Sequence, residues 1–210
     1  MPEIKLNKAI FLDMDGTISK DNKEIYLSHL DKKVKGYVHK IADWELLPNA
    51  EPALKLMSSL DFKLIIITSQ SGIGRGYYTE NDFHILYQHI NNKLQEQGVK
   101  ISGTYFCPHH PEKAIGRYKI ICNCRKPKTG MIDQAVKDHE IDLKKSYVIG
   151  DKTVDIAMGK NAGCKTILVQ TGKAGKDGEY KVMPNYTGSD LLIAAQIIFR
   201  EQRECQGKIK

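Results

Sequence analysis

The sequence lacks any run of about 18 apolar residues, the length that a helix needs to span a membrane. Its first residues, MPEIKLNKAIFLD, lack the basic, apolar and small-residue order of a signal peptide, so we expect a cytoplasmic protein with no membrane association. Aromatic residues make up only 8% of the chain and the lysines are scattered, which disfavours a nucleic-acid-binding surface. Internal repeats and low-complexity segments are also missing, which argues against a repeat array.

What is present is an ordinary globular composition. Of the 210 residues, 41% are hydrophobic and 27% are charged, which predicts a single domain over residues 1–210. The net charge of +7 suits an anionic ligand, but its sign alone does not choose between nucleic acid, an acidic surface and a phosphorylated metabolite. The five cysteines include Cys107, Cys122 and Cys124 in one segment, which favours a reducing compartment and a bound metal over disulfides.

Short apolar runs alternate with helical patterns along the chain. The expected strands are residues 8–13, 63–69, 103–107, 146–151 and 165–171, and the expected helices are residues 51–60, 80–98, 129–141 and 189–203. Continuous Ile/Val/Leu strands alternating with amphipathic helices predict a doubly wound α/β fold, a parallel sheet with helices on both faces. Two segments interrupt this order. Residues 19–47 are polar and predict a flap-like insertion, and residues 107–128 contain Pro, His and Cys but no helix or strand pattern of apolar residues.

Polar residues follow three of these strands, at the edge where doubly wound folds bind ligands. Asp13 and Asp15 follow the first strand and Asp151 follows the fourth. Like-charged carboxylates need a compensating cation, and Mg²⁺ could be bound by the side chains of Asp13 and Asp151 and the backbone carbonyl of Asp15. One carboxylate could then attack a phosphorus atom while the other protonates the leaving oxygen. A simple Asp-x-Asp turn is the alternative, but it leaves the second acidic cluster, GDKTVD, unexplained.

Phosphoryl transfer also needs a hydroxyl group and a cation beside the phosphate. Thr68 or Ser69, at the end of the second strand, could supply the hydroxyl, and a lysine of CRKPK could supply the charge. Alternatively, Thr68 only caps the following helix and Lys126 is a solvated surface lysine. The joint placement of these residues after strand ends favours the functional interpretation.

The irregular segment carries a metal-binding pattern. Its candidate ligands are Cys107, His109, Cys122 and Cys124, three thiolates and one imidazole, which form a closed tetrahedral set for a structural Zn²⁺. The adjacent His110 is an alternative ligand at this stage. Zinc would fix the loop that presents Arg125 and Lys126. A non-catalytic zinc-containing binding module is a further alternative, but it leaves DMDGT and GDKTVD unexplained.

Several motifs in this order resemble a known family. FLDMDGTI, GYVHKIADWELLPNA, TSQSGIGRGYYTENDF, YFCPHHPE, CNCRKPKTGM and VIGDKTVDIAMGKNAG, within about residues 8–172, are similar to the haloacid dehalogenase (HAD) superfamily. Within it they resemble the D-glycero-D-manno-heptose 1,7-bisphosphate 7-phosphatases and, slightly less closely, the histidinol-phosphate phosphatases. The resemblance implies a Rossmann-like HAD fold without a large cap. It also implies hydrolysis of a 7-phosphate through an aspartyl-phosphate, in the biosynthesis of nucleotide-activated heptose for lipopolysaccharide core or another surface glycan.

The resemblance also assigns roles to residues. It implies that Asp13 is the nucleophile, that Asp15 is the general acid and base, and that His109 rather than His110 binds zinc. Thr68, Ser69 and Lys126 would assist catalysis, and Mg²⁺ would be bound by Asp13, Asp15 and Asp151. The implied substrate-binding residues are Gly36, Tyr37, Ser69, Gln70, Ser71, Gly72, Arg125, Lys126 and Lys152. The implied partner is a small phosphorylated sugar, and the site as drawn needs no second subunit, so we expect a monomer.

Three features depart from the family pattern. Met14 replaces an arginine between the two aspartates, and we expect its side chain to point away from the catalytic edge. Ser69 replaces an asparagine, which shortens a hydrogen-bonding arm on the phosphate side. The segment 19–35 is longer than the corresponding segment of the family pattern. The part of the chain that covers the active site could therefore differ, and the substrate with it.

Overall fold

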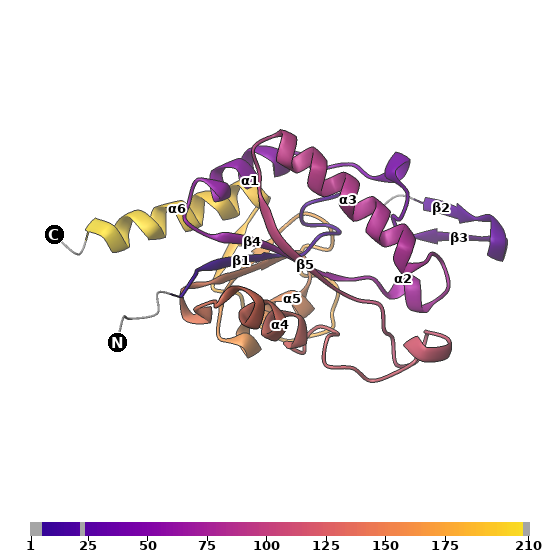
Figure 1. The fold of residues 1–210 in the computed structure, drawn as a ribbon. Coiled ribbons are helices and arrows are strands. Elements are labelled where there is room, and N and C mark those ends of the chain that lie inside the picture. Colours follow the sequence, from indigo (N-terminus) through magenta and orange to yellow (C-terminus); the bar gives the residue numbers. More distant parts are fainter. Residues whose placement is uncertain (1–5, 22–23, 208–210) are drawn as a thin grey trace.

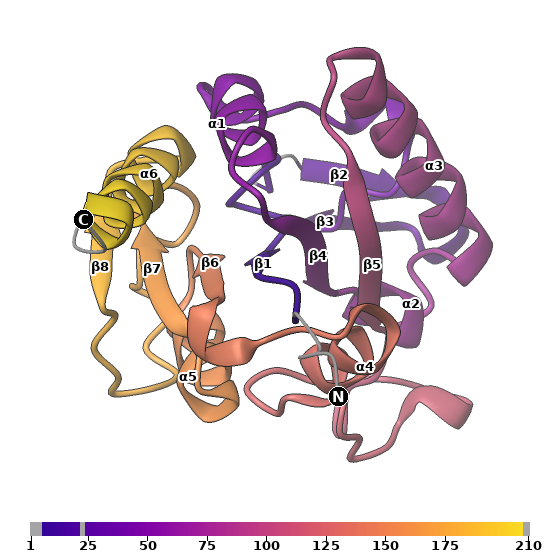
Figure 2. The ribbon, with the colours of Figure 1, turned by 60° about the vertical axis from the view of Figure 1, so that its left-hand side comes forward.

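Six strands form the central sheet of the computed structural model, which describes residues 6–21 and 24–207, with side chains to residue 204. They are β1 (Ala9–Leu12), β4 (Lys63–Ser69), β5 (Ile101–Cys107), β6 (Tyr147–Gly150), β7 (Lys165–Val169) and β8 (Tyr186–Gly188). Their order is β5-β4-β1-β6-β7-β8, and every pairing is parallel. The chain builds β4 and β5 on one side of β1 and then crosses to β6 on the other side (Figure 2). The carboxyl ends of β1, β4 and β6 therefore meet where the order reverses, which is where such sheets bind ligands.

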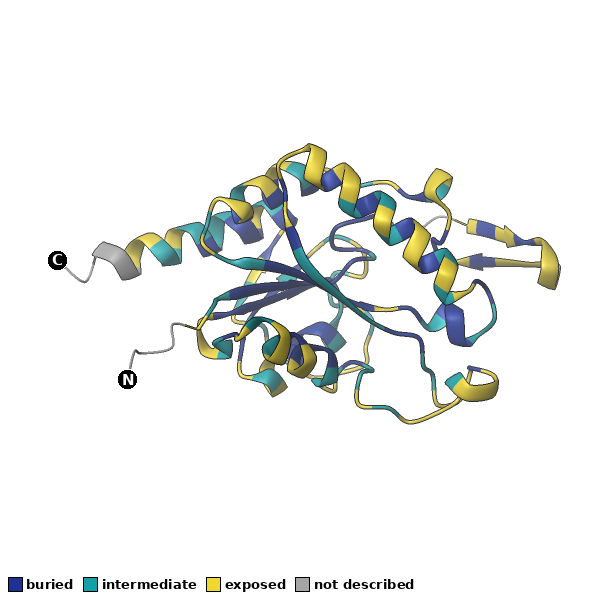
Figure 3. Ribbon diagram, viewed as in Figure 1, coloured by how far each residue is buried: buried dark blue, intermediate teal, exposed yellow. Residues whose placement is uncertain are grey.

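Helices cover both faces of the sheet, as predicted (Figure 1). They are α1 (Ala50–Ser58), α2 (Ser71–Gly74), α3 (Glu80–Glu96), α4 (Gly130–His139), α5 (Thr153–Ala162) and α6 (Leu191–Gly207). In β1, Ile10 and Leu12 pack with residues of α1, α3 and α6, whereas Ala9 and Phe11 pack with residues of α4 and α5. This two-residue alternation divides the apolar core into two layers, and the outward faces of the helices are exposed (Figure 3). None of the helices in the described residues has the length and apolar character needed to cross a membrane.

The flap-like insertion forms a β-hairpin. Strands β2 (Glu24–Leu27) and β3 (Lys32–Lys35) pair antiparallel and extend away from the main sheet (Figure 1). Ile25, Leu27 and Val34 are buried while the residues between them are exposed, so one side of the hairpin contacts the core. Two short 3-10 helices, Ser28–Leu30 and Ile41–Asp43, complete the insertion within its described residues.

Besides the hairpin strands and the 3-10 turns, three elements of the described residues were not predicted: α5, β8 and α2. Helix α5 has an unbroken buried stretch over residues 156–159, which hides the helical period. Gly159 lies within it because a Cβ there would stand 2.5 Å from Cγ2 of Thr166 and 2.9 Å from Cβ of Val148, so the helix packs closely on the sheet. Strand β8 and helix α2 have only three and four residues, too few for a sequence pattern.

The segment 107–128 is irregular, as predicted. It contains one 3-10 turn, Gly116–Tyr118, and another such turn, Leu143–Lys145, precedes β6. Because Cys107 ends β5, the irregular segment starts at the same sheet edge as the catalytic candidates.

Candidate active site

The carboxyl ends of the central strands open on a cavity of about 640 Å³. The predicted site residues that line it are Asp13, Asp15, Gly36, Tyr37, Thr68, Ser69, Ser71, Arg125, Lys126 and Lys152. Three others, Gln70, Gly72 and Asp151, are buried and do not line the cavity. The structure thus brings residues from five separate segments of the chain to one place.

Three buried carboxylates gather at the floor of this site. One side-chain oxygen from each of Asp13, Asp151 and Asp155 lies within 4.8 Å of the others. Oδ2 of Asp13 and Oδ1 of Asp151 are buried and accept no hydrogen bond. Buried carboxylate oxygens without a donor are costly unless a cation is bound beside them, so these residues fit Mg²⁺. Asp155 was not among the predicted ligands, although it closes the GDKTVD motif that drew attention to Asp151.

The ammonium group of Lys152 indicates where positive charge is favoured. Its Nζ lies 3.3 Å from the carbonyl oxygen of Asp15, 3.5 Å from Oδ1 of Asp151 and 3.8 Å from Oδ2 of Asp13. These are atoms of the three residues predicted to bind Mg²⁺, with Asp15 contributing its backbone oxygen. The carboxyl group of Asp15 has a separate partner, because its Oδ2 accepts a hydrogen bond of 3.2 Å from Gln70.

Lys126 holds Asp13 in its charged form. Its Nζ lies 2.6 Å from Oδ1 of Asp13 and 2.7 Å from Oδ1 of Asp155, and all three side chains are buried. Burial would raise the pKa of Asp13, but the charges of Lys126 and Lys152 hold that pKa below its ordinary value. Asp13 is therefore an ionised carboxylate, the form that a nucleophile requires.

Asp15 titrates in a different range. Burial, and next the negative charge of Asp13, raise the pKa of Asp15 to about 7, although Lys152 and the hydrogen bond from Gln70 oppose the rise. One carboxyl group of the pair is thus ionised while its neighbour keeps a proton near neutral pH. Two carboxyl groups whose pKa values are pushed apart by their surroundings can divide the roles of nucleophile and general acid.

A hydrogen-bonded chain behind the cavity positions Asp15 and Thr68. Nε2 of Gln70 donates to Oγ1 of Thr68 at 2.8 Å as well as to Asp15, and Tyr78 donates its hydroxyl hydrogen to Oε1 of Gln70 at 2.6 Å. Because Oγ1 of Thr68 accepts from Gln70, its own hydrogen is left for a phosphate in the cavity. Sequence reasoning missed Tyr78, and no sequence pattern pointed to it.

Glycines allow the flap and the phosphate loop to approach each other. A Cβ at Gly72 would lie 2.2 Å from Cε1 of Tyr78 and 2.9 Å from Cδ1 of Tyr37, so no larger residue fits there. Gly36 has a φ of +80°, a conformation that favours glycine, and it precedes Tyr37, which lines the cavity. Met14, in contrast, is 1% exposed within the apolar core and points away from the site, as predicted.

The four predicted zinc ligands lie together. The three sulfur atoms are 3.2 to 3.6 Å apart, and Nδ1 of His109 lies 3.2 Å from Sγ of Cys124 and 3.8 Å from Sγ of Cys107. Nδ1 of His110 instead accepts hydrogen bonds from the backbone of Glu112 and Lys113. The cluster borders the catalytic cavity, since Nη1 of Arg125 donates to the carbonyl oxygen of His109 at 3.2 Å.

Comparison with known proteins shows which family the chain belongs to. A HAD-hydrolase-like family model matches residues 123–194. The chain is 43% identical over 169 residues to the D-glycero-beta-D-manno-heptose-1,7-bisphosphate 7-phosphatase of Haemophilus ducreyi, covering 80% of this chain and 85% of the relative. It is 42% identical to the D-glycero-alpha-D-manno-heptose-1,7-bisphosphate 7-phosphatase of Photorhabdus laumondii, covering 79% and 84%. The chain belongs to the heptose-1,7-bisphosphate 7-phosphatase family.

A solved structure of a heptose bisphosphate phosphatase supports the fold, and that protein was solved with bound magnesium. The B. bronchiseptica D,D-heptose 1,7-bisphosphate phosphatase, complexed with magnesium and phosphate, superimposes with a TM-score of 0.77 at 26% identity, covering 92% of this chain and 99% of that one. The relatives favour a heptose bisphosphate phosphatase over the histidinol-phosphate alternative. The HAD fold predicted from the motifs is confirmed.

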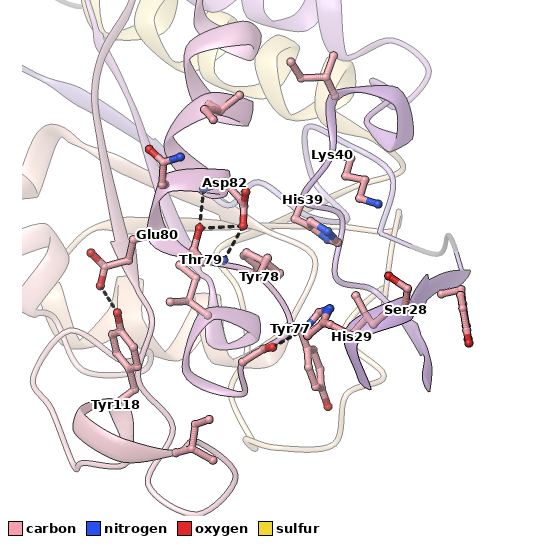
Figure 4. Close-up of a pocket in the computed structure, with 18 of the residues that line it drawn as sticks. Ser28, His29, His39, Lys40, Tyr77, Tyr78, Thr79, Glu80, Asp82 and Tyr118 are labelled. Carbon is pink, nitrogen blue, oxygen red and sulfur yellow. Dashed lines mark hydrogen bonds between the residues drawn. The ribbon is translucent and has the colours of Figure 1, made fainter. Parts of the chain in front are cut away.

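A second, larger cavity of about 980 Å³ lies between the flap and the start of α3 (Figure 4). The flap, the start of α3 and residues 115–118 form its walls, and none of the predicted site residues lines it. Its carboxylates are already engaged, because Asp82 caps α3 through Thr79 and Glu80 accepts a hydrogen bond from Tyr118. It offers no group of catalytic carboxylates, so the smaller cavity is the chemical site.

Proposed function

We propose that the protein hydrolyses the 7-phosphate of D-glycero-D-manno-heptose 1,7-bisphosphate in a Mg²⁺-dependent reaction. One observation carries this proposal: two adjacent carboxyl groups, Asp13 with a pKa lowered by Lys126 and Lys152 and Asp15 with a pKa raised to about 7 by burial, line the same cavity as the phosphate-binding candidates. The names of the relatives support the choice of substrate. A non-catalytic binding module would have no use for two adjacent carboxyl groups with such different pKa values.

In the first half of the reaction, a carboxylate oxygen of Asp13 attacks phosphorus as the bond from phosphorus to the sugar O7 breaks. Asp15 gives its proton to O7, so that the sugar leaves as an alcohol. Lys126 and the hydroxyl of Thr68 stabilise the charge on the phosphoryl oxygens. Asp13, the carbonyl of Asp15 and Asp151 would hold Mg²⁺, which would supply further positive charge at those oxygens.

In the second half, a water molecule attacks the phosphorus of the aspartyl-phosphate. Asp15, now ionised, takes a proton from this water, and the bond between phosphorus and Asp13 breaks. Inorganic phosphate leaves, Asp13 is again a carboxylate and Asp15 again carries a proton. The Gln70 amide keeps Asp15 oriented for both proton transfers.

We further propose that Cys107, His109, Cys122 and Cys124 bind a structural Zn²⁺. The supporting observation is the mutual approach of four ligand atoms, each within 4.8 Å of the others, a number that completes a tetrahedral zinc site. Zinc would hold the carbonyl of His109 in place, and through it the guanidinium of Arg125. Arg125, Lys152, Ser69 and the flap residues Gly36 and Tyr37 are proposed to contact the sugar or its phosphates.

The wider setting is also a proposal. We infer a single domain over residues 1–210, acting as a cytoplasmic monomer in the synthesis of nucleotide-activated heptose for lipopolysaccharide core or another surface glycan. The composition, the predicted ligand residues on one chain and the names of the relatives support this setting.

Substrate comparison tests the proposed function. We expect kcat/KM for heptose 1,7-bisphosphate to exceed that for histidinol phosphate by at least about 100-fold, because only the sugar carries the second phosphate. Release of phosphate should require Mg²⁺, disappear in Asp13→Asn and be unaffected by competitor DNA. A higher kcat/KM for histidinol phosphate would overturn the choice of substrate, and inhibition by DNA would favour the binding module.

A further inference from the structure

Arg75 is a cation in the active-site cavity to which no motif gave a role. It follows α2, and its backbone nitrogen donates to the carbonyl oxygen of Ser71, so it is anchored to the phosphate-side turn. Its guanidinium group lies 5.7 Å from the ring centroid of Tyr37, the flap residue that lines the same cavity. Its Nε is buried and has no hydrogen-bond partner among the described residues.

Six basic side chains line the cavity: Arg75, Arg125, Lys35, Lys126, Lys152 and Lys173. Lys35 and Lys173 form no ion pair with a described carboxylate, but an ammonium group lacks the planar pair of donors of a guanidinium group. Lys126 and Lys152 are both paired with carboxylates of the catalytic floor, so their charge is already compensated. Arg125 donates to a backbone carbonyl, and neither Arg75 nor Arg125 forms an ion pair with a carboxylate in the part of the chain that the structure describes. The cavity therefore holds two uncompensated guanidinium groups besides the catalytic lysines.

The two arginines lie on the same side of the cavity. The turn that leads to Arg75 packs on the loop that Arg125 contacts: a Cβ at Gly74 would lie 2.4 Å from the carbonyl oxygen of Pro108, and Nη1 of Arg125 donates to the carbonyl oxygen of the next residue, His109. Neither arginine pairs with Asp13, which is where the reacting phosphate must lie. Uncompensated positive charge thus accumulates away from the nucleophile.

We propose that Arg75 forms, with Arg125, a second anion subsite that binds the non-reacting phosphate of a sugar bisphosphate. This inference rests on the proposed function and identifies what selects a bisphosphate over a monophosphate. A guanidinium group offers a planar pair of donors that matches a phosphate, and the cation–π contact with Tyr37 holds this group at the cavity.

The test compares two substrates that differ only in the second phosphate, heptose 1,7-bisphosphate and heptose 7-phosphate. We expect Arg75→Met to lower kcat/KM for the bisphosphate about 10- to 100-fold, mainly through KM, and to change kcat/KM for the monophosphate less than about threefold. Arg75→Lys should keep part of the preference, since it keeps the charge and loses the planar pair of donors. Arg117→Met is the matched control, because Arg117 stacks on Tyr118 outside this cavity.

Equal losses with both substrates, or no loss with the bisphosphate, would overturn the subsite. A second experiment distinguishes failure of the subsite from failure of the proposed function. It uses p-nitrophenyl phosphate as the substrate, with fructose 1,6-bisphosphate and fructose 6-phosphate as competing inhibitors. The subsite predicts that the bisphosphate inhibits wild type about tenfold more strongly than the monophosphate, and that Arg75→Met removes this difference. Equal inhibition of wild type by the two competitors contradicts the subsite even if heptose bisphosphate is hydrolysed.

Discussion

Asp13 and Asp15 differ in chemistry because they differ in neighbours. Asp13 forms a buried ion pair with Lys126, whereas the carboxyl group of Asp15 has, among the described residues, only the neutral amide of Gln70 as a hydrogen-bond donor. A buried ion pair lowers the pKa of a carboxyl group, and burial without a paired cation raises it. The division between a charged nucleophile and a protonated acid therefore follows from the placement of one lysine.

The pKa of Asp15 has a measurable effect on stability. In the unfolded chain Asp15 loses its proton near pH 4, but in the folded, metal-free protein it keeps the proton to about pH 7. The folded state thus binds more protons between these values, and the contribution of Asp15 to stability falls as pH rises through that window. The Asp15→Asn substitution removes this pH-dependent loss of stability, because asparagine does not titrate.

We expect Asp15→Asn to stabilise the metal-free protein at pH 8 by on the order of 2 kcal/mol and to have little effect at pH 4. Urea unfolding in the presence of EDTA at both pH values measures the change. Comparison with wild type at each pH cancels the contributions of the other titrating groups. A variant that is equally stable to wild type at both pH values would contradict the assigned shift.

The Tyr78 hydroxyl should matter for proton transfer. Tyr78→Phe frees Oε1 of Gln70, so the amide can turn and lose its hold on Asp15 and Thr68. We expect the rate of phosphoenzyme formation from a sugar phosphate to fall about 5- to 10-fold, because its alkoxide leaving group needs a proton. With p-nitrophenyl phosphate, whose leaving group needs none, the same step should change less than about twofold.

Rapid-quench kinetics with both substrates separate this effect from general damage to the fold. Tyr105→Phe is the control, since it also removes a tyrosine hydroxyl from a carboxylate, that of Asp138, but on the protein surface. Equal losses of Tyr78→Phe with both leaving groups would show that Tyr78 acts on packing alone.

At the scale of elements, three strand ends and one irregular loop build the site. The loop carries two of its cations, Arg125 and Lys126, directly after the last metal-ligand candidate, Cys124. An irregular segment has few backbone hydrogen bonds of its own, so its shape depends on other restraints. Bound zinc would supply that restraint and so control the position of both side chains.

Loss of zinc should therefore lower activity without touching the catalytic carboxylates. We expect Cys122→Ser to lose bound zinc and to lower kcat/KM about 10- to 100-fold, through misplaced Arg125 and Lys126. Metal analysis by mass spectrometry, followed by kinetics on the same samples, tests this. Cys164→Ala is the control, because Cys164 is a buried thiol outside the cluster. A zinc-free sample with normal turnover would refute the proposed role.

At the scale of the whole molecule, the elements whose apolar residues follow a strand or helix pattern were predictable from sequence. The long strand at residues 63–69 matches β4 to the residue, since a buried parallel strand reads as one continuous apolar run. The carboxylates of the DMDGT and GDKTVD motifs could be placed at one edge because strand ends converge there. The position of Met14 in the core also followed from the alternation of side chains along an extended chain.

Other parts depend on contacts between distant segments, which sequence periods do not encode. Helix α5 is buried too completely to show an apolar stripe, and the hairpin pairing of β2 with β3 was not visible in a charged segment. The bonds of Gln70 to Asp15 and to Tyr78 join residues 55 and 8 positions apart. Arg75 stands out only when its lack of a carboxylate partner among the described residues is seen beside the paired lysines.

The phosphoenzyme is the most direct test of the central claim, that Asp13 takes the phosphoryl group and Asp15 moves the proton. Wild-type protein mixed with Mg²⁺ and heptose 1,7-bisphosphate would be quenched in acid within a single turnover and its peptides weighed by mass spectrometry. We predict one phosphoryl group on the peptide that contains Asp13, formed and lost at rates that account for the release of phosphate. Phosphate release without this adduct, or an adduct on another residue, would contradict the account.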